Sequence, residues 1–273
     1  MHISVQIRLL SVCVTLAAIS PVANADTVLI TGANSGIGFE FARQYAGDGW
    51  QVIATHRRDT VPESLAALQN EYQNVRVETI DVTDPDLIAA AARKLKGVPI
   101  DILINNAGIV GTFDDKGQHF GTFDYDAMNR YIAVNTAGPL RVSEAFYENV
   151  LAGKQMKIVA ISSAAGSFAM VRNGIDQNLP LVVRSWYNMS KAALNMAFLQ
   201  LSNFVAGDGV SVAVYHPGLV RVARTASYEL PENFKAMAID VDVSVAGLRQ
   251  RFAELDAEAS GGFYSYDGET IPW

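Results

Sequence analysis

Cysteine is nearly absent from this chain of 273 residues, which has one, Cys13. A single thiol excludes an internal disulfide and a zinc site built from several thiolates. Histidine is scarce too, and the four histidines, at positions 2, 56, 119 and 216, show no metal-ligand spacing. We therefore expect no metal site, and we interpret His216, which precedes a proline, as a structural residue.

Basic residues are also in the minority. The chain has 21 Lys and Arg against 28 Asp and Glu, for a net charge of -7. An acidic balance argues against a nucleic-acid surface. Linkers rich in Pro, Gly or Ser are missing as well, so residues 26–273 are predicted to form a single domain.

No apolar run is long enough to span a membrane, which takes about 20 residues. The longest such stretch, Leu9 to Ile19, follows Arg8 and precedes Ala23-Asn24-Ala25. This pattern is typical of a secretory signal peptide cleaved after Ala25, so we expect an exported, periplasmic protein. The alternative is an uncleaved extension or a mis-chosen start codon on a cytoplasmic protein. Export would leave the chain where free nicotinamide cofactor is expected to be scarce.

Short runs rich in β-branched residues recur along the chain and are typical of buried strands. They cover residues 27–31, 51–55, 75–80, 100–104, 157–162, 210–215 and 262–266. Helix-like stretches alternate with them over residues 37–47, 62–71, 84–95, 126–152, 187–206 and 242–255. This alternation predicts an α/β protein, a doubly wound Rossmann fold whose mostly parallel sheet has about seven strands. Ligands of such sheets bind beyond the carboxyl ends of the strands.

A glycine-rich turn follows the first predicted strand. Glycines let a backbone turn tightly and approach a pyrophosphate, while the next helix presents free N–H groups to it. The alternative is an ordinary strand-to-helix connection, but the position after the first strand favours cofactor binding. The candidate cofactor residues here are Thr31, Gly32, Asn34, Ser35, Gly36, Ile37 and Gly38.

The second predicted strand ends in basic residues where a protein specific for NAD usually has an acid. Arg57 and Arg58 can grip a 2'-phosphate, which favours NADP over NAD. The neighbouring Asp59 keeps open the alternative of a solvated basic turn. After the third strand, Asp81 and Val82 are expected to border the adenine, unless Asp81 only caps the following helix.

Tyr187 and Lys191 are four residues apart, a spacing that puts both on one face of a helix. A phenol, with a pKa near 10, needs a neighbouring ammonium group to become an effective acid–base catalyst at neutral pH. Such a pair can pass a proton to or from an alcohol oxygen. The spacing alone is common, so its meaning depends on the motifs around it.

Those motifs occur in a fixed order. The glycine-rich turn is followed by Asn105-Asn106-Ala107-Gly108, Val134-Asn135, Ser162-Ser163, Tyr187 with Lys191, and Pro217-Gly218. In this order the chain resembles the classical short-chain dehydrogenase/reductase (SDR) family. The stretches "SSAAGS", "YNMSKAALNM", "HPG" and "YDGETIPW" are closer still to a carbonyl-reductase-like branch that includes C-factor signalling proteins.

The resemblance implies a role for each matching residue. Ser163 would bind the substrate oxygen, with Ser162 as the alternative, and Tyr187 would protonate it. Lys191 would hold the nicotinamide ribose and lower the tyrosine pKa, and Asn135 would support a water relay to Lys191, unless it only makes a helix kink or a backbone contact. The remaining cofactor residues would be Asn106, as a scaffold between strands, with Ala107, Gly108, Pro217, Gly218 and Val220. One departure is Val222, where many members place a threonine that contacts the carboxamide; Thr225 would replace it only if the loop shifts.

We therefore expect an NADP(H)-dependent oxidoreductase that interconverts an aldehyde or ketone and an alcohol. The alternative is a cofactor-binding signalling protein of the C-factor type with incidental turnover or none. Family habit implies a homodimer or homotetramer. Loops 109–124, 164–186 and 219–240 should wall the substrate pocket, and their aromatic residues suggest an apolar substrate unless they only pin the loops. These aromatics are Phe113, Phe120, Phe123, Phe168, Trp186 and Tyr228.

Overall fold

The fold is that of a computed structural model, which describes residues 25–111, 116–176, 184–223 and 236–273. The expected signal peptide lies outside the described residues except for its last residue, Ala25, so cleavage and export stay predictions. Phe113, Tyr228 and Thr225 also lie outside them.

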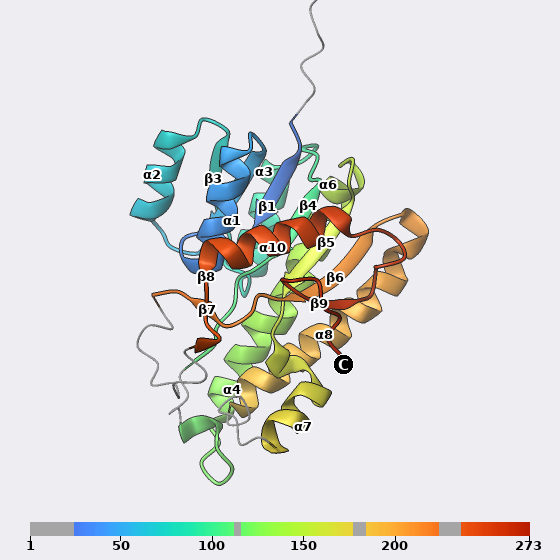
Figure 1. Ribbon diagram of the computed structural model, residues 1–273. Coiled ribbons are helices and arrows are strands. Elements are labelled where there is room, and N and C mark those ends of the chain that lie inside the picture. The colour runs from blue at the N-terminus through green and yellow to red at the C-terminus, as the bar shows by residue number, and fades with distance from the viewer. Residues whose placement is uncertain (1–24, 112–115, 177–183, 224–235) are drawn as a thin grey trace, which may run out of the picture.

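Seven parallel strands form the central sheet, in the order β3-β2-β1-β4-β5-β6-β9 (Figure 1). Their bounds are β1 Thr27–Ile30, β2 Gln51–His56, β3 Val75–Thr79, β4 Ile102–Asn105, β5 Lys157–Ile161, β6 Ser211–His216 and β9 Phe263–Ser265. The strand order reverses between β1 and β4, which is where doubly wound sheets bind their ligands. The predicted fold class is confirmed.

Helices cover both faces of the sheet because the strands are apolar on both sides. In β1, Val28 and Ile30 face one core and Leu29 faces the other, as the two-residue period of a strand requires. The first core lies under α1 Gly36–Gly47, α2 Glu63–Glu71 and α10 Val241–Glu254. The second lies under α3 Pro85–Lys94, α5 Gly138–Ala145, α6 Tyr147–Leu151 and α8 Ser185–Val205.

The single helix predicted over residues 126–152 is wrong. In its place are α4 Tyr125–Ile132, the π-helical segment η2 Ala133–Ala137, α5, and α6 after a break at Phe146. The apolar pattern runs through all four segments, so it does not report where the hydrogen-bond register changes. This change of register brings Asn135 into the interior, where it is fully buried.

A helix and a pair of short strands occur where only loops were expected. Helix α7 Phe168–Asp176 follows the short 3-10 turn η3 Ala164–Gly166, and β7 Val220–Arg221 pairs in parallel with β8 Ile239–Asp240. The start of α7 is tied to the last residues of the chain, because Ala169 N–H donates to the Trp273 carbonyl oxygen at 3.1 Å. The shorter 3-10 turns are η1 Lys116–Gln118 and η5 Ala206–Asp208. Within the described ranges, no helix combines the length and the apolar character needed to cross a membrane.

Candidate active site

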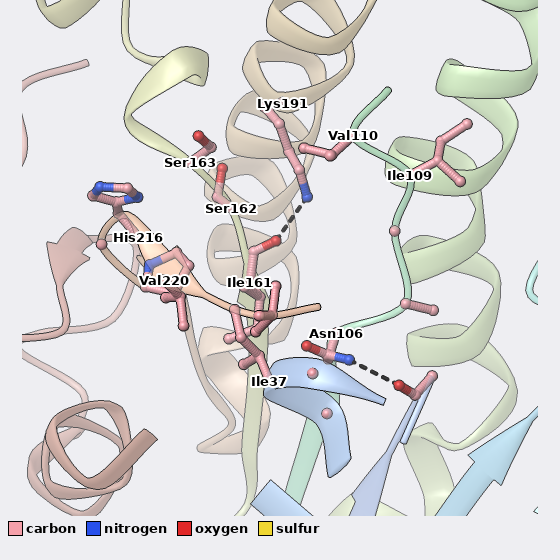
Figure 2. Close-up of a pocket in the computed structure, with 18 of the residues that line it drawn as sticks. Ile37, Asn106, Ile109, Val110, Ile161, Ser162, Ser163, Lys191, His216 and Val220 are labelled. Atoms are coloured by element: carbon pink, nitrogen blue, oxygen red, sulfur yellow. Dashed lines mark hydrogen bonds between the residues drawn. The ribbon is translucent and has the colours of Figure 1, made fainter. Parts of the chain in front are cut away.

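A cavity of about 810 Å³ opens at the carboxyl ends of β1, β4, β5 and β6. That volume lies in the range of ligand and cofactor pockets. Of the residues predicted for the site, Thr31 and Asn135 do not line the cavity, and every other one does. Figure 2 shows Ile109 and Val110 on one side of it and Ser162, Ser163 and His216 on the other.

The glycine-rich turn is shaped by contacts that leave no room for side chains. Gly32 has a φ of +66°, and a Cβ there would lie 3.0 Å from Ala107 Cα. A Cβ on Gly38 would overlap the Asn106 side-chain amide, which donates to the carbonyl oxygens of Thr31 and Gly32 at 3.0 and 3.2 Å. Asn106 therefore joins the loops that follow β1 and β4, as a scaffold.

Thr31 acts behind the cavity wall. Its hydroxyl oxygen accepts hydrogen bonds from the backbone N–H groups of Asn106 and Ala107, both at 3.0 Å. It thus fixes the same pair of loops from the other side. We assign it to the support of the site, because it does not line the cavity.

The first turn of α1 faces the cavity through Gly36, Ile37 and Gly38. The residue before the helix, Ser35, has extended backbone and makes no side-chain cap, and the first turn carries no acidic residue. The amide groups of a helix N-terminus attract anions, so this turn fits a pyrophosphate. Glycine at position 38 lets the helix begin this close to the turn, since a Cβ there would overlap the Gly32 carbonyl oxygen.

The part of the cavity wall that follows β2 is basic. Arg57 and Arg58 are exposed after β2 and line the cavity beside Asp81. The Asp81 carboxylate accepts from the N–H and hydroxyl of Thr83, whereas Asp84 caps α3 by accepting from two backbone N–H groups. Of the two interpretations of Asp81, the helix cap is therefore wrong, and its place on the cavity wall fits the adenine border.

Tyr187 and Lys191 are one turn apart on α8, and both are buried. The Lys191 ammonium nitrogen lies 6.0 Å from the centroid of the Tyr187 ring and donates to the Ile161 carbonyl oxygen at 2.8 Å (Figure 2). Burial lowers the pKa of Lys191 from 10.5 to about 8. A Cβ on Gly108 would lie 3.8 Å from this nitrogen, so the loop after β4 passes close to it.

The two candidate serines are distinguished by their partners. The Ser162 hydroxyl is bonded to Asn195 Oδ1 on α8 at 2.5 Å and is buried. The Ser163 hydroxyl accepts from Ala165 N–H at 3.2 Å and is only half-buried at the cavity wall. The Ser163 hydroxyl hydrogen is therefore the one available to a substrate oxygen.

Asn135 lies in η2 and is buried behind the part of the cavity wall to which Lys191 belongs. Its side-chain oxygen accepts from Ile109 N–H at 2.8 Å, and its nitrogen donates to the Ile109 carbonyl oxygen at 2.8 Å and to Ser190 Oγ at 2.9 Å. Both earlier alternatives, a kink and a backbone contact, describe what is present. The same bonds hold the loop at Ile109 against the cavity.

The substrate end of the cavity differs from the aromatic pocket suggested by the sequence. Phe120 and Phe168 are exposed, and Phe123 packs on Trp186 with ring centroids 4.5 Å apart. None of these four described residues lines the cavity, and of the four only Phe123 and Trp186 pack into a buried cluster. The three loops predicted to wall the pocket, 109–124, 164–186 and 219–240, do contribute to this end, through Val110, Met170, Arg184, Leu219 and Met237. Tyr266 lines it as well and was not predicted.

His216, expected to be structural, also lines the cavity. It lies beside Ser162, because Ser162 N–H donates to the carbonyl oxygen of Tyr215, the residue before His216, at 2.7 Å. Burial lowers the pKa of His216 to about 4, so its imidazole is neutral at physiological pH. Within the described ranges, no cluster of three or more His, Cys, Asp or Glu residues is placed to hold a metal ion.

A Rossmann sheet with a glycine-rich turn at its switch point, joined to Ser163, Tyr187 and Lys191 in one cavity, defines a class of nicotinamide-dependent oxidoreductases. The chain belongs to the short chain dehydrogenase family, whose model matches residues 26–233.

Known proteins similar to this chain include enzymes and a signalling protein. A 1-hydroxy-2-glutathionyl-2-methyl-3-butene dehydrogenase of Rhodococcus sp. strain AD45 is 31% identical over 91% of this chain and 100% of its own. The NADPH-bound carbonyl reductase from chicken fatty liver superposes with a TM-score of 0.79 at 30% identity, over 92% of this chain and 100% of its own. The C-signal protein of Myxococcus xanthus is 32% identical over 64% of this chain and 93% of its own.

Proposed function

We propose that this protein is an NADP(H)-dependent reductase of aldehydes or ketones, with Tyr187 as general acid. The observation that carries the proposal is one cavity that joins two kinds of site. One end has the glycine-rich turn, the α1 N-terminus and two arginines, and the other end has Ser163, Tyr187 and Lys191. The NADPH held by the chicken carbonyl reductase supports the choice of cofactor.

The residues of the first end would hold the cofactor in order along the cavity. Arg57 and Arg58 would bind the 2'-phosphate, and Asp81 with Val82 would border the adenine. The N–H groups of Gly36, Ile37 and Gly38 would receive the pyrophosphate. Ala107, Gly108, Pro217, Gly218 and Val220 would enclose the nicotinamide half. When bound, the cofactor supplies the hydride that reduces the carbonyl carbon.

The second end handles the proton. The Ser163 hydroxyl donates a hydrogen bond to the carbonyl oxygen, and Tyr187 transfers its phenolic proton to that oxygen as the carbon is reduced. Lys191 stays close to the phenol as a cation at neutral pH, because its pKa of about 8 lies above 7. An ammonium group near the ring favours the phenolate that proton transfer leaves behind.

Replacing the general acid tests this mechanism. We expect NADPH oxidation by the chain from residue 26 with at least one member of a panel of aldehydes, ketones and glutathione-adduct aldehydes. The adducts are included because of the glutathionyl substrate in the Rhodococcus enzyme's name. Tyr187→Phe keeps the ring and should lower kcat by about 100-fold or more, the usual size of a general-acid contribution. Phe123→Tyr, in the same aromatic cluster but off the cavity, should leave kcat unchanged.

A second candidate function is cofactor-dependent signalling, favoured by the similarity to C-signal and by Val222 at a position where a carboxamide contact is usual. Val222 packs near the glycine-rich turn, 3.6 Å from where a Gly36 Cβ would lie. The same panel separates the candidates. Tight NADPH binding without any Tyr187-dependent oxidation of NADPH would favour the signalling role.

A further inference from the structure

Three polar residues lie side by side where β5, β6 and β9 end at the cavity. Ser162 follows β5, His216 ends β6 and Ser265 ends β9, and these strands are neighbours in the sheet. Ser162 N–H donates to the carbonyl oxygen of Tyr215, the residue before His216, and His216 pairs in register with Ser265. All three line the cavity, and we call them the polar row. His216 and Ser265 have no part in the cofactor contacts or the proton step proposed above.

The polar row lies on the face of the sheet that α8 covers. Each member continues a row of side chains of the second core, because side chains two residues apart share a face of a strand. These core side chains are Ile158 and Ala160 on β5, Val212 and Val214 on β6, and Phe263 on β9. Helix α8 packs on β6 and carries Tyr187 and Lys191. The polar row therefore extends the substrate end of the cavity from the proposed proton donor toward β9.

The His216 ring has a hydrogen to donate. Within the part of the chain that the structure describes, neither of its nitrogens forms a hydrogen bond, and Nδ1 is enclosed. The imidazole is neutral at physiological pH, so one nitrogen carries a hydrogen and the other a lone pair. A buried N–H without a partner is less common than a buried acceptor without one, which places the hydrogen on Nε2 at the far end of the ring. Figure 2 shows this ring on the same side of the cavity as Ser162 and Ser163.

A hydrogen-bond acceptor lies in the same part of the wall. Asp267 follows β9, is exposed and lines the cavity, and its Oδ1 accepts from Glu269 N–H at 3.3 Å. A carboxylate has about four lone-pair sites, so this bond leaves capacity for a ligand. The charge of Asp267 reaches the ring, because burial lowers the pKa of His216 and the carboxylate opposes that change. A donor and an acceptor therefore face the same end of the cavity.

This combination restricts the group that fits between the two side chains. A hydroxyl group can accept from His216 Nε2–H and donate to Asp267. A substrate carboxylate would be repelled by Asp267, and an alkyl group would leave the imidazole N–H unpaired after displacing water. Neighbouring strands are about 4.8 Å apart, so a hydroxyl group bound at His216 lies close to a carbonyl group held by Ser163.

We propose that His216 selects carbonyl substrates that carry a hydroxyl group on the carbon next to the reacting carbonyl. The proposal rests on the reductase function above and names the substrate class of that site. His216 donates to the hydroxyl oxygen, Asp267 accepts the hydroxyl hydrogen, and Ser163 and Tyr187 bind the carbonyl oxygen. The hydroxyl group is held in both the ground state and the transition state, so it contributes to KM more than to kcat.

A matched pair of ketones, phenacyl alcohol and propiophenone, tests this selection, since the first has a hydroxyl group where the second has a methyl group. His216→Leu removes the N–H without adding charge. It should lower kcat/KM for phenacyl alcohol by about 10-fold through KM and leave propiophenone within about threefold. The different reactivity of the two ketones cancels when each variant is compared with wild type. His216→Gln, whose amide nitrogen can replace Nε2 as a donor, should restore part of the loss, and Asp267→Leu should lower kcat/KM for phenacyl alcohol alone.

His119→Leu is the matched control. His119 also has an enclosed ring nitrogen without a partner among the described residues, but it does not line the cavity, so this variant should change neither ketone. Equal losses for the two ketones in His216→Leu would overturn the proposal, and so would an unchanged kcat/KM for phenacyl alcohol. An unchanged value in Asp267→Leu would overturn the choice of a hydroxyl group.

Binding of two unreactive amides separates this proposal from the proposed function. Glycolanilide and propionanilide differ by the same hydroxyl and methyl groups, and NADPH reduces neither. Calorimetry on the NADPH complex should show glycolanilide binding about 10-fold more tightly than propionanilide to wild type and to Tyr187→Phe, and equally to His216→Leu. That result would support the selection even if no ketone is reduced. Equal affinities of the wild-type protein for the two amides would contradict it.

Discussion

At the scale of single residues, the site keeps a cation where the fold alone would not place one. Lys191 is buried among the elements that carry the second core, and its protein partner is the Ile161 carbonyl oxygen. A drop of its pKa from 10.5 to about 8 corresponds to about 3 kcal/mol of unfavourable free energy at neutral pH. Such a cost fits the role proposed for Lys191, since proteins commonly lose stability where a site needs an unfavourable group.

Replacing this lysine by methionine should therefore stabilise the protein at neutral pH. Between pH 8 and 10.5 the unfolded chain binds the lysine proton and the folded chain has released it. The free energy of unfolding that Lys191 contributes therefore rises with pH across this window, and it is lost as pH falls through 8. We expect the advantage of Lys191→Met, about 2 kcal/mol at pH 7, to shrink by pH 10. Urea unfolding at several pH values measures it, and Lys96→Met on the surface is the control. Parallel curves for wild type and Lys191→Met would contradict the burial cost.

The sequence predicted the residues whose chemistry is local and missed those whose role depends on packing. Tyr187 and Lys191 share a helical spacing that gained its meaning from the ordered motifs around it, and the role of Ser163, with Ser162 as the alternative, was implied by the family resemblance. Arg184 lies in a loop that was predicted to wall the pocket but was not singled out, and His216 was interpreted as structural, because nothing in their neighbours reveals that both turn toward the cavity. Asp84, not Asp81, caps α3, since the cap depends on backbone angles that the sequence pattern does not specify.

At the scale of elements, the irregular segment η2 connects α8, which carries Tyr187 and Lys191, to the loop after β4. Its five residues, Ala133–Ala137, interrupt the register between α4 and α5 and bring Asn135 to Ile109 on one side and Ser190 on the other. π-Helical turns of this kind are often found at functional sites. The apolar periodicity predicted helix throughout this region, and it could not predict the extra residue in the turn because the same face stays buried on both sides of it.

Removal of the Asn135 side chain should loosen the loop at Ile109 as well as the fold. Asn135→Ala removes two part-buried hydrogen bonds to the Ile109 backbone, which costs about 1–3 kcal/mol. Asn149 is a matched control, since it is buried in α6 and donates to the Leu95 and Val98 carbonyl oxygens, both at 2.8 Å, away from the cavity. We expect both alanine variants to unfold at lower urea, and only Asn135→Ala to lose kcat, by about 10-fold or more. Equal kcat in the two variants would mean that Asn135 serves the fold alone.

At the scale of the whole molecule, the order of the strands brings the two ends of the site together. The glycine-rich turn follows β1, the basic turn follows β2, and Ser163 follows β5, so a ligand that reaches all three must cross the sheet at its switch point. The alternation of strands and helices was sufficient to predict this arrangement. It was not sufficient to predict α7 or the β7–β8 pair. These elements are short, and they lie in segments where the sequence pattern predicted only loops.

Because the cofactor would contact the segments that follow five strands, β1, β2, β3, β4 and β6, its binding should stabilise the whole fold. At about 100 times its dissociation constant, a ligand adds about 2.7 kcal/mol, which raises the Tm of a domain this size by roughly 5–11 °C. We expect NADP to give a shift of this size and NAD a much smaller one at equal concentration. The double variant Arg57→Ala/Arg58→Ala should lower the NADP shift to that of NAD, whereas Arg93→Ala, an exposed arginine on α3, should keep the difference. Thermal unfolding with each cofactor measures this directly. Equal shifts in the wild-type protein, or a preference for NADP that survives the double variant, would show that the basic turn after β2 is only solvated.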